Sequence, residues 1–279
     1  MFDMIREMLS FDFIIKALVV GILVSLCAAL LGVSLVLKRY SMIGDGLSHV
    51  GFGTLAIAVS LGLAPLQVSI PLLLLAAFLL LRISESSRIK GDAAIALISS
   101  SSLAAGVVVL AMTVGMNTDV CNYLFGTILA MKNSDVYLSV SLASVILVLF
   151  ALFYNKIFSV TFDEGFARAT GTNAKLYNML IAFMTALVIV VGMRIMGAML
   201  ISSLIIFPAL TAMRVLKSFR QVIICSAILS VCCFFAGILI SFAFDTPAGA
   251  SVVLVNLVAF LVFAAIAQAG KLVVVKEVK

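Results

Sequence analysis

Nine stretches of apolar residues, each about long enough to cross a lipid bilayer, dominate this sequence of 279 residues. A bilayer core about 30 Å thick needs roughly 20 apolar residues per helix, with a range of about 17–25. Lipid offers no hydrogen-bond partners to a bare backbone, so only helices and closed barrels can span it. The sequence therefore predicts one all-α transmembrane domain over residues 1–279, with eight or nine spanning helices. The expected spans lie near residues 13–37, 45–63, 65–81, 93–116, 136–154, 176–193, 197–213, 222–243 and 249–269.

The composition excludes the soluble classes of protein. Hydrophobic residues make up 65% of the chain and charged residues 11%, against roughly 45–50% apolar and about 25% charged in soluble domains. No polar stretch is long enough to form a second, soluble domain. The chain also lacks the G-x-x-x-x-G-K-[ST] sequence that cradles nucleotide phosphates. Any ATP-driven activity would therefore need a separate ATPase chain.

Two regions of this pattern leave alternatives open. The stretch 176–213 is nearly continuous, interrupted only by Gly192-Met193-Arg194 and Gly197, and it fits two short helices or one long tilted helix. The segment Tyr123–Met131 is too short to span the bilayer. We expect that segment to lie at the membrane interface or to re-enter the membrane.

The distribution of basic residues predicts the orientation of the chain. With nine spans, 14 of the 18 lysine and arginine residues fall on one face of the membrane and four on the other. Basic loops stay in the cytoplasm, so we expect the N-terminus outside and the C-terminus in the cytoplasm. The net charge of +6 follows from this asymmetry and indicates anionic lipid, not nucleic acid, as the neighbour of the basic face.

Asp45 and His49 are the most informative polar residues in an apolar stretch. An ionisable side chain in the bilayer costs about 2.5–3.5 kcal/mol on insertion scales and is a functional candidate for that reason. Four residues apart on a helix, the two side chains share one face. A carboxylate oxygen and an imidazole nitrogen make half of a tetrahedral site for an ion such as zinc. Alternatively, Asp45 begins the helix as an N-cap and His49, the only histidine, is a hydrogen-bonded core residue.

Two ligands are too few for a closed metal site, and a symmetric dimer is one way to supply four. Gly44, Gly46, Gly51 and Gly53 would let two helix backbones approach closely. Ordinary packing within one chain explains the same glycines equally well. Elsewhere in the spans we expect hydrogen bonds between helices from Asn178, Thr211, Asn256 and Gln268.

The loop 161–173 lies on the expected cytoplasmic face and has the pattern of a short helix. Asp163 and Glu164 suit the positive N-terminal end of a helix, and Gly171 can end it. Phe162, Phe166 and Ala169 are spaced to form one apolar edge. Such a helix can lie on a membrane surface, but it is sparsely basic for that role. We favour a groove on a partner protein.

Together these residues resemble the membrane-spanning permeases of bacterial ABC importers for zinc, manganese and iron, and most closely the zinc permease. The resembling stretches are spread over nearly the whole chain in the order of the family. One departure is Gly51-Phe52-Gly53, where the family frequently has Leu-Pro-Gly after the histidine. The stretches are Gly44-Asp45-Gly46-Leu47-Ser48-His49, Tyr123–Leu129, Phe162–Gly171, and Gly197–Ala209 followed by Asp245–Leu254.

The resemblance implies a multi-pass protein of the bacterial cell (inner) membrane that is a transporter subunit and not an enzyme. It implies a homodimer with two cytoplasmic ABC ATPase subunits and an extracellular metal-binding protein that delivers the ion. By the same resemblance, Asp45 and His49 line the path of the transported ion, and no permanently bound cofactor is expected. The segment 161–173 corresponds to the coupling helix, with Phe162, Asp163, Glu164, Phe166, Ala167, Arg168 and Gly171 facing or shaping the ATPase contact.

Other functions remain open from the sequence. A secondary cation transporter can also carry an Asp and a His four residues apart, and it would need no ATPase. An ABC permease for manganese, iron or a metal chelate would share most of these features, and a structural membrane protein is the least favoured reading. Two ligands do not distinguish zinc from manganese; the overall likeness favours zinc.

Overall fold

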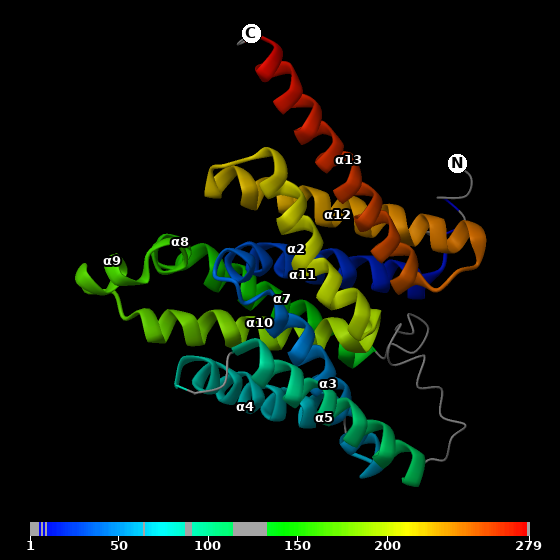
Figure 1. Ribbon diagram of the computed structural model, residues 1–279. Helices are drawn as coiled ribbons and strands as arrows, with labels where there is room; N and C mark the ends of the chain where they lie inside the picture. The colour runs from blue at the N-terminus through cyan, green and yellow to red at the C-terminus, as the bar shows by residue number, and fades with distance from the viewer. Residues whose placement is uncertain are drawn as a thin grey trace.

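All regular structure that the computed structural model describes is α-helical (Figure 1). The described residues are 10–63, 65–86, 91–113 and 133–277, together with Arg6 and Met8. The expected interfacial segment Tyr123–Met131 lies outside them. The helices within these ranges are α2 (Asp12–Leu37), α3 (Ser41–Ser60), α4 (Pro65–Ser86), α5 (Gly91–Thr113), α7 (Asn133–Leu152), α8 (Tyr154–Phe162), α9 (Glu164–Ala169), α10 (Ala174–Met196), α11 (Ala198–Val215), α12 (Phe219–Phe244) and α13 (Ala248–Glu277).

In the described part of the chain, nine helices are long and apolar enough to cross a membrane. They are all of the helices named above except α8 and α9, which have 9 and 6 residues. The sequence prediction of an all-α protein with eight or nine spans is confirmed at its upper value. The apolar runs were sufficient evidence because span length depends only on bilayer thickness and helix rise.

The stretch 176–213 forms two helices, α10 and α11, which meet at Gly197. The backbone of Gly197 has φ 86° and ψ 159°, a conformation that is essentially confined to glycine. A helix cannot continue through that conformation, so the chain turns there. This result decides between the two alternatives that the sequence left open.

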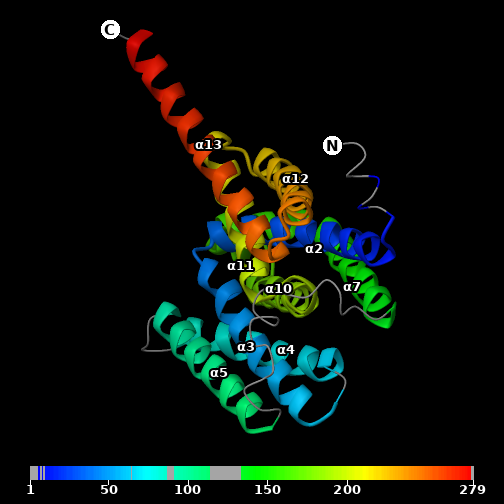
Figure 2. The same ribbon diagram turned by 90° about the vertical axis from the view of Figure 1, so that its right-hand side faces the viewer.

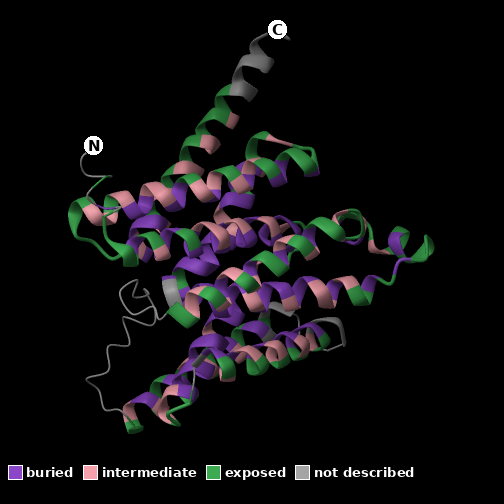
Figure 3. Ribbon diagram, turned by 180° about the vertical axis from the view of Figure 1, so that it is seen from behind, coloured by how far each residue is buried: buried purple, intermediate pink, exposed green. Residues whose placement is uncertain are grey.

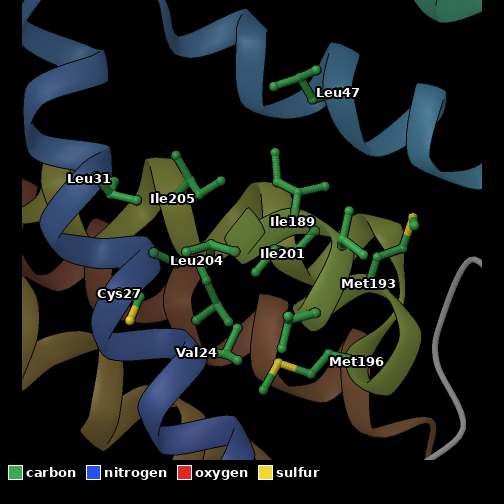
Figure 4. Packing of buried hydrophobic residues seen from close by; sticks show 14 of the residues in the cluster. Val24, Cys27, Leu31, Leu47, Ile189, Met193, Met196, Ile201, Leu204 and Ile205 are labelled. Atoms are coloured by element: carbon green, nitrogen blue, oxygen red, sulfur yellow. The ribbon is translucent and has the colours of Figure 1, made fainter. Parts of the chain in front are cut away.

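The interior of the bundle is built around α2, α10 and α11. Figures 1 and 2 show α3, α4 and α5 on one side of these helices and α12 and α13 on the other. Buried residues are concentrated in the middle of the molecule and include most of α3, whereas α13 is largely exposed (Figure 3). One cluster of buried side chains joins the layers, including Leu31 of α2, Leu47 of α3, Ile189 of α10 and Ile205 of α11 (Figure 4).

The glycines of α3 face other helices of the same chain. A Cβ atom on Gly46 would lie 2.5 Å from Ile95 Cγ2 of α5, and one on Gly53 would lie 2.8 Å from the carbonyl oxygen of Ser102, also in α5. Gly44 faces Ile205 and Gly51 faces Met193 in the same way. These contacts use the small residues for packing inside one protomer. The alternative, in which they let two copies of α3 approach each other, is wrong for these positions because α5, α10 and α11 already fill that space.

Candidate functional site

Helix α3 brings Asp45 and His49 onto one face, one turn apart. His49 Nε2 lies 3.7 Å from Asp45 Oδ2, which is too long for a hydrogen bond. The side chain of His49 is 25% exposed and that of Asp45 is 43% exposed. Helix α3 begins at Ser41, with Tyr40 at the N-cap position. The alternative in which Asp45 caps the helix is therefore wrong, because one full turn of helix precedes it.

The separation of these two atoms suits a shared metal ion. An ion bonded at about 2.1 Å to both atoms at the tetrahedral angle would hold them about 3.4 Å apart. Closing the observed 3.7 Å to that value needs a shift of only a few tenths of an ångström. His49 Nδ1 is buried and has no hydrogen-bond partner in the described part of the protein. The alternative of a satisfied core histidine is not supported.

Asp45 and His49 line a cavity of about 520 Å³ between α3, α11 and α13. Three serine hydroxyls also line it, and each donates to a carbonyl of its own helix: Ser48 to Asp45 at 2.7 Å, and Ser202 and Ser203 to Ala198 and Leu200 at 2.8 Å. A hydroxyl whose proton is used in this way retains oxygen lone pairs that a cation can attract. The remaining lining is apolar and comprises Ala198, Met199, Leu200, Ile206, Phe207, Gly249, Ala250, Val253 and Leu254.

Asp45 and His49 are two candidate ligands, whereas a tetrahedral metal site needs four. Among the described residues, no group of three or more His, Cys, Asp or Glu side chains is placed to hold a metal ion. The sequence identified Asp45 and His49 but not the serines of α11. Those serines carry no distinctive spacing, and their place opposite α3 depends on how α11 packs.

The loop 161–173 contains the short helix expected from the sequence. Asp163 is its N-cap, and its carboxylate accepts a hydrogen bond of 2.9 Å from the backbone N–H of Phe166. Helix α9 then runs from Glu164 to Ala169, and Gly171 follows with φ 79°. One expectation was wrong: Phe162 is the last residue of α8, so the apolar edge is shared by two helices. The extended backbone of Asp163, at φ −146° and ψ 99°, separates them.

Helix α9 is anchored on one side and exposed on the other. Ala167 is fully buried and packs with Val160 of α8 and Ala174 of α10. Phe162 and Phe166 are 56% and 63% exposed. Exposed aromatic side chains held on a fixed backbone are typical of an interaction surface. Figure 1 shows α9 projecting from one end of the bundle.

A buried lysine that the sequence did not single out connects this helix with the bundle. Lys38, at the end of α2, has only 8% of its side chain exposed. Its Nζ atom donates to Asn178 Oδ1 of α10 and lies 3.8 Å from Glu164 Oε2 of α9. Burial of the Glu164 carboxyl acts to raise its pKa, but hydrogen bonds from Arg168 and Asn178 and the charge of Lys38 outweigh burial and lower the pKa from its ordinary value.

The prediction of hydrogen bonds between helices is confirmed for Asn178 but not for the other residues that the structure describes. Thr211 donates to Phe207 at 2.7 Å and Asn256 to Val252 at 2.9 Å, both within their own helices. Side chains of this kind reach the carbonyl four residues earlier, which removes the need for a partner helix. Gln268 is exposed on α13.

This arrangement defines a class of protein: a multi-span α-helical membrane permease with an acid–imidazole pair that lines a cavity between helices. The chain belongs to the ABC 3 transport family, whose model matches residues 10–267. This confirms the resemblance to the permeases of zinc and manganese ABC importers. Within that family the permease is a transporter subunit, and ATP is hydrolysed by a separate chain.

Individual relatives match over nearly the full length of the chain. The manganese import system permease ScaB of Streptococcus gordonii is 31% identical, over 93% of each chain. The high-affinity zinc uptake system membrane protein ZnuB of Haemophilus influenzae is 32% identical, over 90% of this chain and 96% of its own. A chain in the solved structure of PsaBC from Streptococcus pneumoniae in complex with Fab matches with a TM-score of 0.84, at 32% identity over 94% of both chains.

Proposed function

We propose that this chain is the permease subunit of an ATP-driven importer that carries a divalent metal ion, with zinc as the expected cargo, across a bacterial cell membrane. The observation that carries the proposal is the pairing of Asp45 and His49 in the cavity between α3, α11 and α13. Placing a carboxyl and an imidazole in a membrane helix costs insertion free energy, so such residues are usually retained for a function. Membership of the ABC 3 transport family supports the same function.

A second copy of the chain supplies the missing ligands in this proposal. Two protomers related by a twofold axis would bring two Asp45 carboxylates and two His49 rings to one ion, the number that a tetrahedral site needs. The partial exposure of the Asp45 side chain leaves room for this approach. Because no hydrogen bond from the described residues fixes Nδ1 of the His49 ring, the site would bind more weakly than a structural metal site, as a carrier that releases its ion requires.

The segment 161–173 is the proposed contact with the ATPase. In this proposal Phe162 and Phe166 enter a groove on each of two cytoplasmic ATPase subunits, while Ala167 holds α9 against the permease. Closure of the ATPases on ATP would draw the two α9 helices together and switch access to the cavity from outside to inside. An extracellular metal-binding protein would deliver the ion.

Manganese is the second candidate for the cargo. The cavity offers oxygen from the Asp45 carboxylate and from three serine hydroxyls, and manganese favours oxygen ligands more than zinc does. ScaB, a similar permease, is named for manganese import.

Transport assays of site variants test the proposal. With the permease reconstituted in proteoliposomes together with its ATPase, we expect Asp45→Ala and His49→Ala to abolish uptake of radioactive zinc while still co-purifying with the ATPase. Ser60→Ala is the matched control, because Ser60 lies on the same helix outside the cavity and its hydroxyl bonds to the carbonyl of Ile57. Uptake at the wild-type rate in both site variants would refute the assignment. Parallel assays with manganese identify the preferred ion.

Arg168→Glu and Gly165→Pro in α9 test the coupling role. We expect both variants to hydrolyse ATP without transporting metal, whereas unchanged coupling would place α9 on lipid instead. Dependence of uptake on a proton gradient, and not on ATP, would favour a secondary cation transporter.

A further inference from the structure

The cluster formed by Lys38, Glu164 and Asn178 joins three segments that are far apart in the sequence. Lys38 ends α2, Glu164 begins α9 and Asn178 lies in the second turn of α10. The Lys38 side chain is 8% exposed and the Asn178 side chain is buried. The asparagine accepts from Lys38 through Oδ1, and its amide group helps to hold the pKa of the Glu164 carboxyl below its ordinary value.

A buried ammonium group has to keep its partners. Removing an ionised amine from water is strongly unfavourable unless it is paired and hydrogen-bonded. If Glu164 moved away while Lys38 stayed, the ammonium group of Lys38 would lose the Glu164 carboxylate as a partner inside the protein. A displacement of α9 is therefore expected to carry Lys38 with it, which a purely apolar contact would not require.

Lys38 is also attached to the helix that carries the metal-binding pair. Only Arg39 and Tyr40 separate it from the start of α3 at Ser41. The backbone of this turn is conformationally restricted. Arg39 adopts a left-handed conformation with φ 61°, and the Tyr40 N–H donates to the Leu35 carbonyl at 2.8 Å. Asp45 follows in the second turn of α3. A displacement of Lys38 is therefore expected to displace the N-terminal end of α3, the helix that carries Asp45 and His49.

The other contacts of α9 have a different character. Ala167 packs against Val160 and Ala174, and Lys156 of α8 donates to Thr172 at 3.3 Å. These contacts hold α9 to α8 and α10, its neighbours in the sequence. The Lys38 contact instead reaches from α9 to the α2–α3 turn.

We infer that Lys38, held by Glu164 and Asn178, is a positioning residue for transport: it transmits movement of α9 to α3 and so links ATP-driven closure to the Asp45–His49 site. This inference rests on the proposed role of α9 as the coupling helix. Lys38 does not touch the ion. Its function is to make α9 and the base of α3 move as one unit.

The first test measures metal transported per ATP hydrolysed by the reconstituted transporter. We expect Lys38→Met to keep assembly and basal ATP hydrolysis. Both Lys38→Met and Glu164→Gln should lower the ratio about tenfold, within the roughly 5–150-fold range typical of coupling between two sites. The exchange Lys38→Glu with Glu164→Lys should restore the ratio to within about threefold of wild type, because paired substitutions report their interaction. Asn178 can serve both arrangements, since its amide group both donates and accepts.

The matched control is Lys156→Met, which removes a lysine beside α9 that does not belong to the cluster. This variant should keep the wild-type ratio. A ratio within about twofold of wild type in both Lys38→Met and Glu164→Gln would overturn the inference. If Lys38→Met does not assemble, Glu164→Gln and the charge exchange still decide, since Glu164 is one-third exposed and its loss leaves no cavity.

A second measurement separates movement from folding. An environment-sensitive fluorophore is attached to a single cysteine, in one protein at exposed Met42 of α3 and in another at exposed Thr170 after α9. In the wild type, ATP should change the signal at both positions. In Lys38→Met, the response at Thr170 should remain and that at Met42 should be lost. A full response at Met42 in this variant would refute the inference alone, whereas no response at Thr170 in the wild type would refute the coupling role of α9 and the inference with it.

Discussion

Lys38 and the pair Asp45 and His49 place polar side chains inside the protein in two different ways. Lys38 is buried but is paired with Glu164 and Asn178. Asp45 and His49 face a cavity and keep their facing atoms 3.7 Å apart. In the first arrangement the polar atoms pair within the chain, and in the second they face a cavity and lie too far apart for a hydrogen bond. This difference distinguishes an ionic contact within the protein from a candidate binding site on physical grounds.

The lowered pKa of Glu164 gives a pH-dependent contribution to stability. A carboxyl whose pKa is lower in the folded state stabilises it above the unfolded pKa, about 4.5, and loses that contribution as pH falls through the folded pKa. Glu164→Gln should therefore lower the thermal unfolding midpoint at pH 7, and the difference from wild type should shrink below about pH 4.5. Melting curves of the detergent-purified protein across pH measure this. A difference that stays constant with pH would contradict the ion pairing.

At the scale of helices, the position of each wall of the cavity depends on how closely backbones approach. Gly32 of α2 and Gly44 of α3 both face Ile205 of α11, the helix that carries the cavity serines. A Cβ on Gly32 would lie 1.9 Å from the backbone oxygen of Ile205, whereas one on Gly44 would lie 3.2 Å from the tip of its side chain. A side-chain tip can rotate away, but a backbone oxygen cannot move without the helix.

Gly32→Ala should consequently destabilise the protein much more than Gly44→Ala. We expect a cost of about 1–3 kcal/mol or a failure to fold for Gly32→Ala, typical of overpacking, and a smaller cost for Gly44→Ala. Thermal unfolding of the two purified variants provides a comparison with matched chemistry. Equal midpoints would show that α2 and α11 separate more easily than the close contact at Ile205 implies.

At the scale of the whole molecule, the basic loops gather at the end of the bundle that carries α9. The turn after α2, the turn between α11 and α12, and the α8–α9 segment all lie at this end, as Figure 1 shows. Because the coupling proposal requires α9 to meet a cytoplasmic ATPase, it requires the same orientation as the basic residues predict.

Single-cysteine labelling of intact cells tests this orientation. In a cysteine-free background, Leu63→Cys, between α3 and α4, should react with a membrane-impermeant thiol reagent. Lys217→Cys, between α11 and α12, should react only after the cells are opened. Both positions are exposed. The reverse pattern would refute the orientation and, with it, the proposed ATPase contact of α9.

Hydropathy, spacing and capping residues are local properties, and the sequence determined what depends on them. It predicted the spans, the α9 helix between Asp163 and Gly171, and the shared face of Asp45 and His49. It also located the possible interruption of the stretch 176–213 at Gly192 to Arg194 or at Gly197. Only the backbone angles of Gly197 showed that the stretch forms two helices.

The tertiary structure alone decided which segments meet. It placed α11 and α13 opposite Asp45 and His49, turned the glycines of α3 toward helices of the same chain, and gave Lys38 a partner 126 residues later in Glu164. Such contacts depend on the packing of helices far apart in the chain. From the sequence, a lysine at the end of a span such as Lys38 is expected to lie in water. Only the fold shows that α9 and α10 contact it and bury it.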